Sequence, residues 1–178
     1  MSLPIFFELF LQLLVGNIDQ IMLSGYSETS VAAIGNANTI INLVIVILTM
    51  AASGGMIALT HYIGAGDEQK QKTAIIWTFV LGGAFGLIFT VILVAAAKPL
   101  LTALNAPQEI IPEAAGYITV VGAGLILQAL MLSGTAVLRS FSRLKDILII
   151  AVVMNLTNIL GNWLLINGIS IFPEMGIM

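Results

Sequence analysis

The chain has 178 residues, of which 59% are hydrophobic and 8% are charged, whereas about a quarter of the residues in an ordinary soluble domain are charged. Nine Asp and Glu against six Lys and Arg give a net charge of −3, which leaves no basic surface for nucleic acid. The lack of cysteine and the single histidine, His61, exclude disulfides, thiolate nucleophiles and the common zinc and haem sites. Composition therefore predicts a protein that has the lipid bilayer as its main solvent, and it supports neither an enzyme nor a bound cofactor.

Five apolar stretches are long enough to cross the hydrocarbon core, which takes about 20 residues of helix. They are residues 4–24, 31–63, 73–97, 109–138 and 147–167. Because backbone polar groups in lipid must be hydrogen-bonded within the segment, each stretch is predicted to be one helix. The expected fold is an all-α integral membrane protein, a bundle of five transmembrane helices within a single domain of residues 1–178.

Two local signals bear on how these helices pack and connect. The glycines Gly82 and Gly86 form a GxxxG pattern, and Ser53-Gly54-Gly55 interrupts the long second stretch, so close packing or a bend is expected at both places. Between the third and fourth stretches, residues 98–105 (KPLLTALN) are predicted to be either a short helix lying in the membrane interface or a plain loop.

Positive charge predicts the orientation of the chain in the membrane. Five of the six basic residues follow the second and fourth stretches, and only Lys98 lies in another connection. Since Lys and Arg gather in cytoplasmic loops, the N-terminus is predicted to be cytoplasmic in a multi-pass protein of the cell membrane. The five on the cytoplasmic side are Lys70, Lys72, Arg139, Arg143 and Lys145.

Polar side chains recur at helical spacing inside four of the five stretches. Such residues are costly in lipid and mark candidate functional sites. Because steps of three, four and seven residues share one helix face, each set forms a stripe, and the four stripes are expected to converge on a shared, hydrated interior. The stripes contain Glu8, Gln12 and Asp19; Asn38, Asn42, Thr49, Ser53 and Thr60; Tyr117, Gln128 and Thr135, with Gly124 on the same face; and Asn155, Asn158 and Asn162.

Asp19 is the carboxylate placed deepest in these stripes. It lies about five residues before the outer end of the first stretch, as Asn162 does in the fifth, so the two share one depth. A carboxylate held there can exchange a proton, or it can bind a sodium ion together with amide oxygens. The structural alternatives are helix capping or interhelical hydrogen bonding by Asp19, interhelical bonding by Asn158 and Asn162, and interfacial solvation of Glu8.

Several segments together resemble the multidrug and toxic compound extrusion (MATE) family of secondary transporters. These are LPIFFELFLQLLVGNIDQIMLSG (3–25), SVAAIGNANTI (30–40), HYIGAGDEQK (61–70), LSGTAVLRSFSRLKD (132–146) and NLTNILGNWLLINGI (155–169). The resemblance implies most of the first of two six-helix lobes, with the C-terminal lobe missing. It also implies an antiporter that exports small organic compounds, often cationic, in exchange for protons or sodium ions, without a cofactor.

The resemblance also implies roles for residues. Asp19 matches the aspartate of the family's first helix, Asn158 and Asn162 fall on polar positions of the fifth helix, and Arg139 fits the arginine after the fourth. Some relatives have an aspartate in place of Asn162, so this chain keeps one fixed charge instead of two. The coupling site is expected at Asp19, Asn158 and Asn162, and the substrate cavity is expected to be lined by Asn38, Asn42, Gln128, Thr135 and Asn155.

Two other functions remain open at this point. A lipid-linked oligosaccharide flippase of the same superfamily is expected to have a basic cavity, and no span interior here contains Lys or Arg. A structural membrane subunit without transport activity is expected to tolerate Asp19→Leu, whereas a coupled transporter is not.

Overall fold

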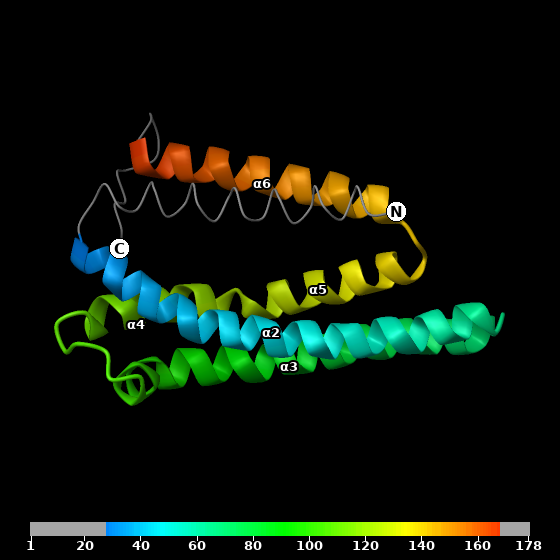
Figure 1. The fold of residues 1–178 in the computed structure, drawn as a ribbon, viewed down its shortest axis with the longest axis horizontal. Helices are drawn as coiled ribbons and strands as arrows, with labels where there is room; N and C mark the ends of the chain where they lie inside the picture. Colours follow the sequence, from blue (N-terminus) through cyan, green and yellow to red (C-terminus); the bar gives the residue numbers. More distant parts are fainter. Residues whose placement is uncertain (1–27, 168–178) are drawn as a thin grey trace. The chain divides into compact units, whose positions relative to one another are not determined.

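The computed structural model describes the backbone of residues 28–167 and the side chains of residues 35–157. All regular secondary structure in this part of the chain is helical (Figure 1). The expected stretch 4–24 lies outside the described residues. The helices are α2 (Glu28–Gly64), α3 (Glu68–Ala103), α4 (Ile111–Ala123), α5 (Leu125–Ser140) and α6 (Leu144–Asn167).

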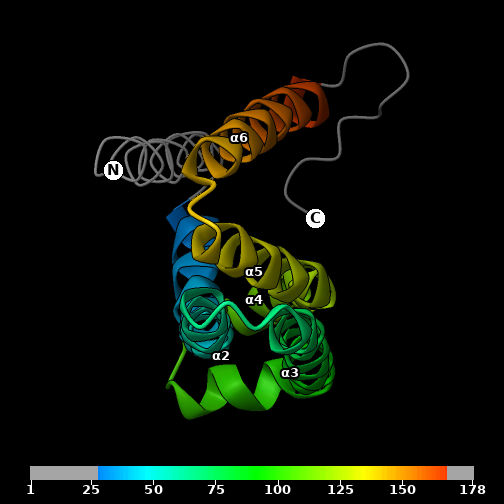
Figure 2. The ribbon, with the colours of Figure 1, turned by 90° about the vertical axis from the view of Figure 1, so that its right-hand side faces the viewer.

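The chain divides into two compact units, and each is described by itself. Helices α2 to α5 form the unit Glu28–Arg143, and α6 belongs to the other. Within the first unit, α2 and α3 each pack against the other three helices (Figure 2). The contacts of α3 are the more extensive, so α3 is the central element. The turn between α2 and α3 makes these two helices antiparallel, and α5 runs antiparallel to α3 as well.

Among the residues that the structure describes, two helices are long and apolar enough to cross a membrane, over Gly35–Gly64 and Glu68–Ala103, and the pair α4 and α5 passes the same test when taken together. Large apolar side chains face outward along them, including Met50 and Val120, which are each 70% exposed. A soluble protein seldom presents so much apolar surface, whereas a lipid-facing one does. The expected all-α membrane fold is confirmed.

The fourth stretch differs from its prediction as one helix over 109–138. It consists of α4 and α5, which are bent by 46° at Gly124. There the Gly124 N–H donates to the Val121 carbonyl oxygen at 3.0 Å, a bond across three residues instead of four. Glycines at 122 and 124 supply no side chain to hold the turn, so the α-helical ladder breaks at this point.

The end of α3 also differs from the expected boundary at residue 97. The backbone leaves helical angles at Ala96 (φ −116°, ψ 17°) and then continues as helix to Ala103. Pro99 explains the kink, because it has no N–H to donate and its ring displaces the preceding turn. Figures 1 and 2 both show this last segment, the α3 arm (residues 97–103), turned across the axis of the rest of α3. Of the two alternatives for residues 98–105, the structure therefore shows the helix.

Small residues let α3 approach its neighbours closely, as the GxxxG pattern predicts. A Cβ atom added at Gly86 would lie 2.7 Å from the Ala129 Cβ, and one added at Gly82 would collide with the Ser133 hydroxyl. One turn before Gly82, α3 meets α2: a Cβ added at Gly55 would lie 2.7 Å from the Thr78 methyl group. Gly55 therefore serves close packing, and α2 continues through residues 53–55 as one helix.

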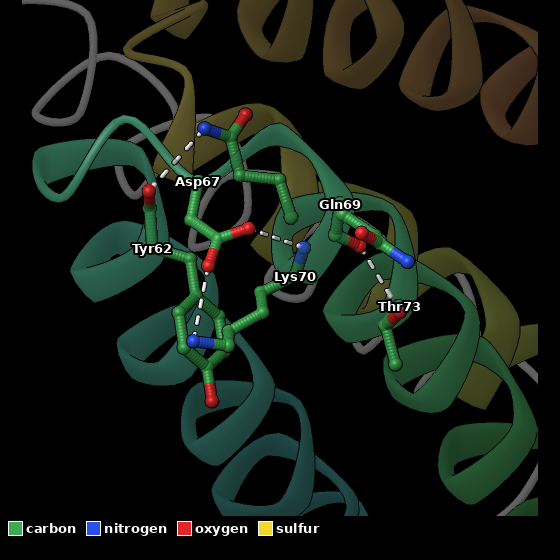
Figure 3. Close-up of polar contacts among 6 residues, drawn as sticks. Tyr62, Asp67, Gln69, Lys70 and Thr73 are labelled. Carbon is green, nitrogen blue, oxygen red and sulfur yellow. Dashed lines mark hydrogen bonds and ion pairs between the residues drawn. The ribbon is translucent and has the colours of Figure 1, made fainter.

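Polar contacts fix the turn between α2 and α3 (Figure 3). The Asp67 carboxylate accepts the backbone N–H of Lys70 at 3.0 Å and pairs with the Lys70 ammonium group at 3.0 Å. The ammonium group also lies 5.9 Å from the centre of the Tyr62 ring, and the Gln71 amide donates to the Tyr62 carbonyl oxygen at 3.3 Å. Asp67 is thus the N-cap of α3, and the turn is held from both helices.

The contact of α3 with α5 predicts opposite effects for two neighbouring glycines. Gly86→Ala forces the helices apart, since its Cβ would lie 2.7 Å from Ala129, and is expected to destabilise the protein by about 1–3 kcal/mol. Gly83→Ala is the control, because its Cβ would lie 3.6 Å from Leu130, an ordinary contact, while Ala favours the helix. Thermal unfolding in detergent measures both, and equal melting temperatures would contradict the packing.

The cap of α3 predicts a local effect of pH. The backbone N–H of Lys70, and then its ammonium group, lower the pKa of the Asp67 carboxyl below the ordinary value of 3.8. The stabilisation that the Asp67 carboxylate contributes is therefore complete above pH 3.8, the ordinary pKa of the group in the unfolded chain. It is lost as the pH falls through the lower pKa that Asp67 has in the folded protein. Amide hydrogen exchange at Lys70, corrected for its intrinsic pH dependence, is expected to lose protection in this window.

Two variants of Asp67 separate the cap from the charge. Asp67→Ala is expected to remove the protection of the Lys70 amide at neutral pH. Asp67→Asn is expected to keep most of it, because Asn is as good an N-cap as Asp, and to abolish the pH effect. Equal protection in Asp67→Ala and the parent would show that the cap does not hold this turn.

Candidate functional site

The expected coupling residues fall at the edge of what the structure describes. Asp19 lies outside the described residues. Asn158 and Asn162 lie in the helical backbone of α6, and their side chains are outside the described set. Asn155, one turn earlier on α6, is half-buried. Because α6 is helical from Leu144 to Asn167, positions 155, 158 and 162 follow one face of it.

One contact joins two of the predicted polar stripes. The Tyr117 hydroxyl on α4 donates to the Asn38 side-chain oxygen on α2 at 3.3 Å. Both residues are half-buried, and Ala37 and Ile118 beside them are completely buried. A hydrogen bond in such apolar surroundings is electrostatically stronger than one in water, so it links the two helices at a defined register.

The other cavity candidates do not meet Asn38 in this unit. Asn42, one turn along α2, is exposed, as is Gln128 in the first turn of α5, and Thr135 is half-buried. The prediction placed Tyr117, Gln128 and Thr135 in one stripe because it assumed one helix. The 46° bend at Gly124 divides that stripe, so the contact of Tyr117 fixes α4 and does not fix the position of Gln128.

Hydroxyl groups along α2 satisfy themselves within the helix. Thr49, Ser53 and Thr60 each donate to the carbonyl oxygen four residues earlier, at 2.8 Å in every case. Their donors are therefore used, while their oxygens can still accept from a ligand. No group of three or more His, Asp or Glu side chains gathers into a metal site in residues 35–157. What this unit offers a ligand is amide and hydroxyl hydrogen bonding.

Two buried serines carry interhelical bonds that the sequence analysis did not single out. The Ser133 hydroxyl lies within bonding distance of the carbonyl oxygens of Thr78 on α3 (3.2 Å) and Ala129 (3.0 Å). The Ser140 hydroxyl is placed likewise between Met56 on α2 (3.2 Å) and its own helix. The available signal was spacing, because alanine precedes each serine by four residues, which is a small-xxx-small pattern.

The bond between Tyr117 and Asn38 can be tested with a double-mutant cycle. Tyr117→Phe and Asn38→Ala are expected to show a coupling energy of about 0.6 kcal/mol, and at most about 1.7 kcal/mol, as interhelical bonds in membranes do. The matched control cycle replaces Asn38→Ala by Asn42→Ala, one turn away and exposed, and its coupling is expected to be near zero. Unfolding in mixed detergent micelles measures both cycles. Equal coupling energies in the two cycles would show that Tyr117 and Asn38 are not joined by a specific hydrogen bond.

Comparison with known proteins identifies a family and relatives of this chain. The MatE family profile matches residues 4–164. The chain is 35% identical over 176 residues to "Uncharacterized transporter YisQ" of Bacillus subtilis, a match that covers 98% of this chain and 38% of that protein. It is 30% identical over 182 residues to "Probable multidrug resistance protein NorM" of Thermotoga maritima, with 99% and 38% covered. The chain thus spans about 38% of the length of these relatives.

A solved structure shares the fold. A crystal structure of a MATE protein in complex with MaD3S superposes with a TM-score of 0.88 at 22% identity, covering 97% of this chain and 39% of that one. With the family match over 4–164 and two transporters among its relatives, the chain belongs to the MatE family of membrane transporters.

Proposed function

We propose that this chain forms part of a secondary active transporter that exports small organic compounds, often cationic ones, in exchange for protons or sodium ions. Membership of the MatE family over residues 4–164 is the observation that carries the proposal. The name of the Thermotoga maritima relative, a multidrug resistance protein, supports the class of substrate. Because the chain spans about 38% of these relatives, the proposed transporter includes a second lobe outside this sequence.

The coupling ion is proposed to bind at Asp19, assisted by Asn158 and Asn162. A carboxylate in a membrane span needs a partner, and the amides of a neighbouring helix can supply oxygen ligands to sodium or hydrogen bonds to the protonated acid. The regular helix of α6, which carries Asn155, Asn158 and Asn162 along one face, supports such an amide row. Either ion then neutralises one charge at this point.

Transport is proposed to follow alternating access. An ion can drive the change only if it binds the two states with different affinity. Within the Glu28–Arg143 unit, the bend at Gly124 and the kink at Ala96 supply backbone positions that can absorb a change in angle. Substrate is proposed to contact the amide and hydroxyl groups of Asn38, Asn42, Gln128, Thr135 and Asn155.

The proposed orientation places the N-terminus in the cytoplasm and the protein in the cell membrane. Lys70 and Lys72 lie at the start of α3, and α5 runs towards the same end of the unit, where Arg139 and Arg143 lie (Figure 1). Lys98 lies at the opposite end, in the α3 arm. Since basic residues mark the cytoplasmic side, this distribution supports the orientation.

The coupling role of Asp19 is tested by export of a cationic dye from cells that express the full-length protein. Asp19→Asn keeps the shape of the side chain and removes its charge, so export is expected to fall to the level of cells without the transporter. The matched control is Glu8→Gln, the same chemical change nearer the cytoplasmic end of the same stretch, which is expected to keep the parent rate.

The coupling ion is identified by collapsing the proton gradient or the sodium gradient, one at a time, in membrane vesicles. A proton ionophore is expected to stop export through a proton-coupled protein, and removal of sodium is expected to stop a sodium-coupled one. If Asp19→Asn exports dye at the parent rate under both gradients, Asp19 has no role in coupling. Export that needs neither gradient would contradict the antiport proposal as a whole.

A further inference from the structure

A groove opens between the kinked end of α3 and the first half of α4. Its volume is about 480 Å³. The groove forms because the α3 arm turns away at Ala96 and leaves the corner beside α4 unfilled. It lies wholly within the Glu28–Arg143 unit, and its lining residues are Val94, Ala95, Ala97, Lys98, Pro99, Pro112, Ala115, Gly116 and Thr119.

The lining is apolar except at one end. Lys98 is its only charged side chain, and Thr119 is its only other polar one. The Thr119 hydroxyl donates to the Ala115 carbonyl oxygen at 2.8 Å, so its donor is already used. Lys98 is exposed, and no carboxylate in the described residues lies within ion-pair distance of it. Glu113, next to Pro112, is not part of the lining. The groove therefore combines an apolar wall with one positive charge that has no protein partner in this part of the chain.

The position of Lys98 along α3 indicates which part of the bilayer the groove faces. Lys98 follows the last turn of the apolar part of α3, at the start of the arm that crosses the end of the unit (Figure 2). Val94 lines the groove together with Lys98 and is 43% exposed. Val91, one turn before Val94 and on the same side of α3, is 57% exposed. A lysine at the end of a span directs its ammonium group to the level of lipid headgroups, while its stem and the valines lie along the acyl chains.

We propose that this groove binds an anionic phospholipid. The phosphate pairs with the Lys98 ammonium group, and an acyl chain runs from the groove along Val94 and Val91. Charge complementarity selects an anionic headgroup, because the lining has one cation and no anion, and the apolar wall selects a lipid over a soluble phosphate. With the proposed orientation, this lipid belongs to the outer leaflet. Lipid binding here requires no coupling role for Asp19.

The test compares lipid adducts on the purified full-length protein in detergent by native mass spectrometry. Phosphatidylglycerol is expected to remain bound more than phosphatidylcholine. Lys98→Gln is expected to weaken the phosphatidylglycerol adduct about fivefold, the effect of one lysine near a membrane surface. It is expected to weaken the phosphatidylcholine adduct less, because the choline cation offsets the charge of that phosphate. Lys72→Gln, an exposed lysine at the opposite end of α3, is the control and is expected to keep the parent ratio.

A second variant fills the groove and keeps the charge. Gly116→Leu is expected to lower the adducts of both lipids, because a Cβ at Gly116 meets no atom within 4 Å and the side chain has room to occupy the groove. Its matched control is Gly54→Leu, an exposed helical glycine of α2 whose Cβ also meets nothing within 4 Å and which lies outside the groove. Melting temperatures close to that of the parent check that all four variants fold.

Three results would overturn the proposal. Equal loss of phosphatidylglycerol in Lys98→Gln and Lys72→Gln would show general attraction to basic residues. Unchanged adducts in both Lys98→Gln and Gly116→Leu would remove the groove as the binding place. Displacement of phosphatidylglycerol by millimolar inorganic phosphate would show that the site recognises a phosphate group and not a lipid.

Discussion

Helices in lipid gain no hydrophobic energy from meeting one another, so they associate only where their surfaces fit closely or share hydrogen bonds. In this chain both conditions meet on the central helix α3. Its glycines at 82 and 86 admit Ala129 and Ser133 of α5, and the Ser133 hydroxyl reaches the carbonyl oxygen of Thr78. The positions of α4, of the arm after Ala96 and of the groove between them follow from this contact, because α3 touches every other helix of its unit.

The unit uses uncharged polar groups in two distinct ways. Ser133 and Ser140 are buried and reach carbonyl oxygens of other helices, so they serve assembly. Thr49 and Thr60 are exposed and bond only within α2, which leaves their oxygens available to a ligand. Asn38 belongs to the same stripe of α2 as these threonines, but its side-chain oxygen accepts a hydrogen bond from Tyr117 of another helix. One stripe of α2 thus contributes a bond between helices, at Asn38, and hydroxyl groups that bond only within α2, at Thr49 and Thr60.

The sequence predicted the class of fold because apolar length and the need to satisfy the backbone leave few choices in lipid. It also predicted close packing at Gly82 and Gly86 from spacing alone. It did not predict the division of residues 109–138, because glycines at 122 and 124 are tolerated inside many membrane helices and break a helix only in particular surroundings. Nor could it place Gln128 relative to Asn38, since that depends on the angle at the break. The roles of Asp19, Asn158 and Asn162 remain predictions, as their side chains lie outside the described residues.

The arm after Ala96 constrains how this unit can move in a bilayer. As a straight rod, the 36 residues of α3 would be about 54 Å long, well beyond a hydrocarbon core of about 30 Å. Because the chain turns at Ala96, the α3 arm runs across the helix axis and forms a lateral projection, or flange, at one end of α3. A piston-like displacement of α3 along the membrane normal would have to drag the flange through the headgroup layer, whereas tilting and swivelling would not. Rocking of the Glu28–Arg143 unit therefore requires less free energy than a displacement along the membrane normal.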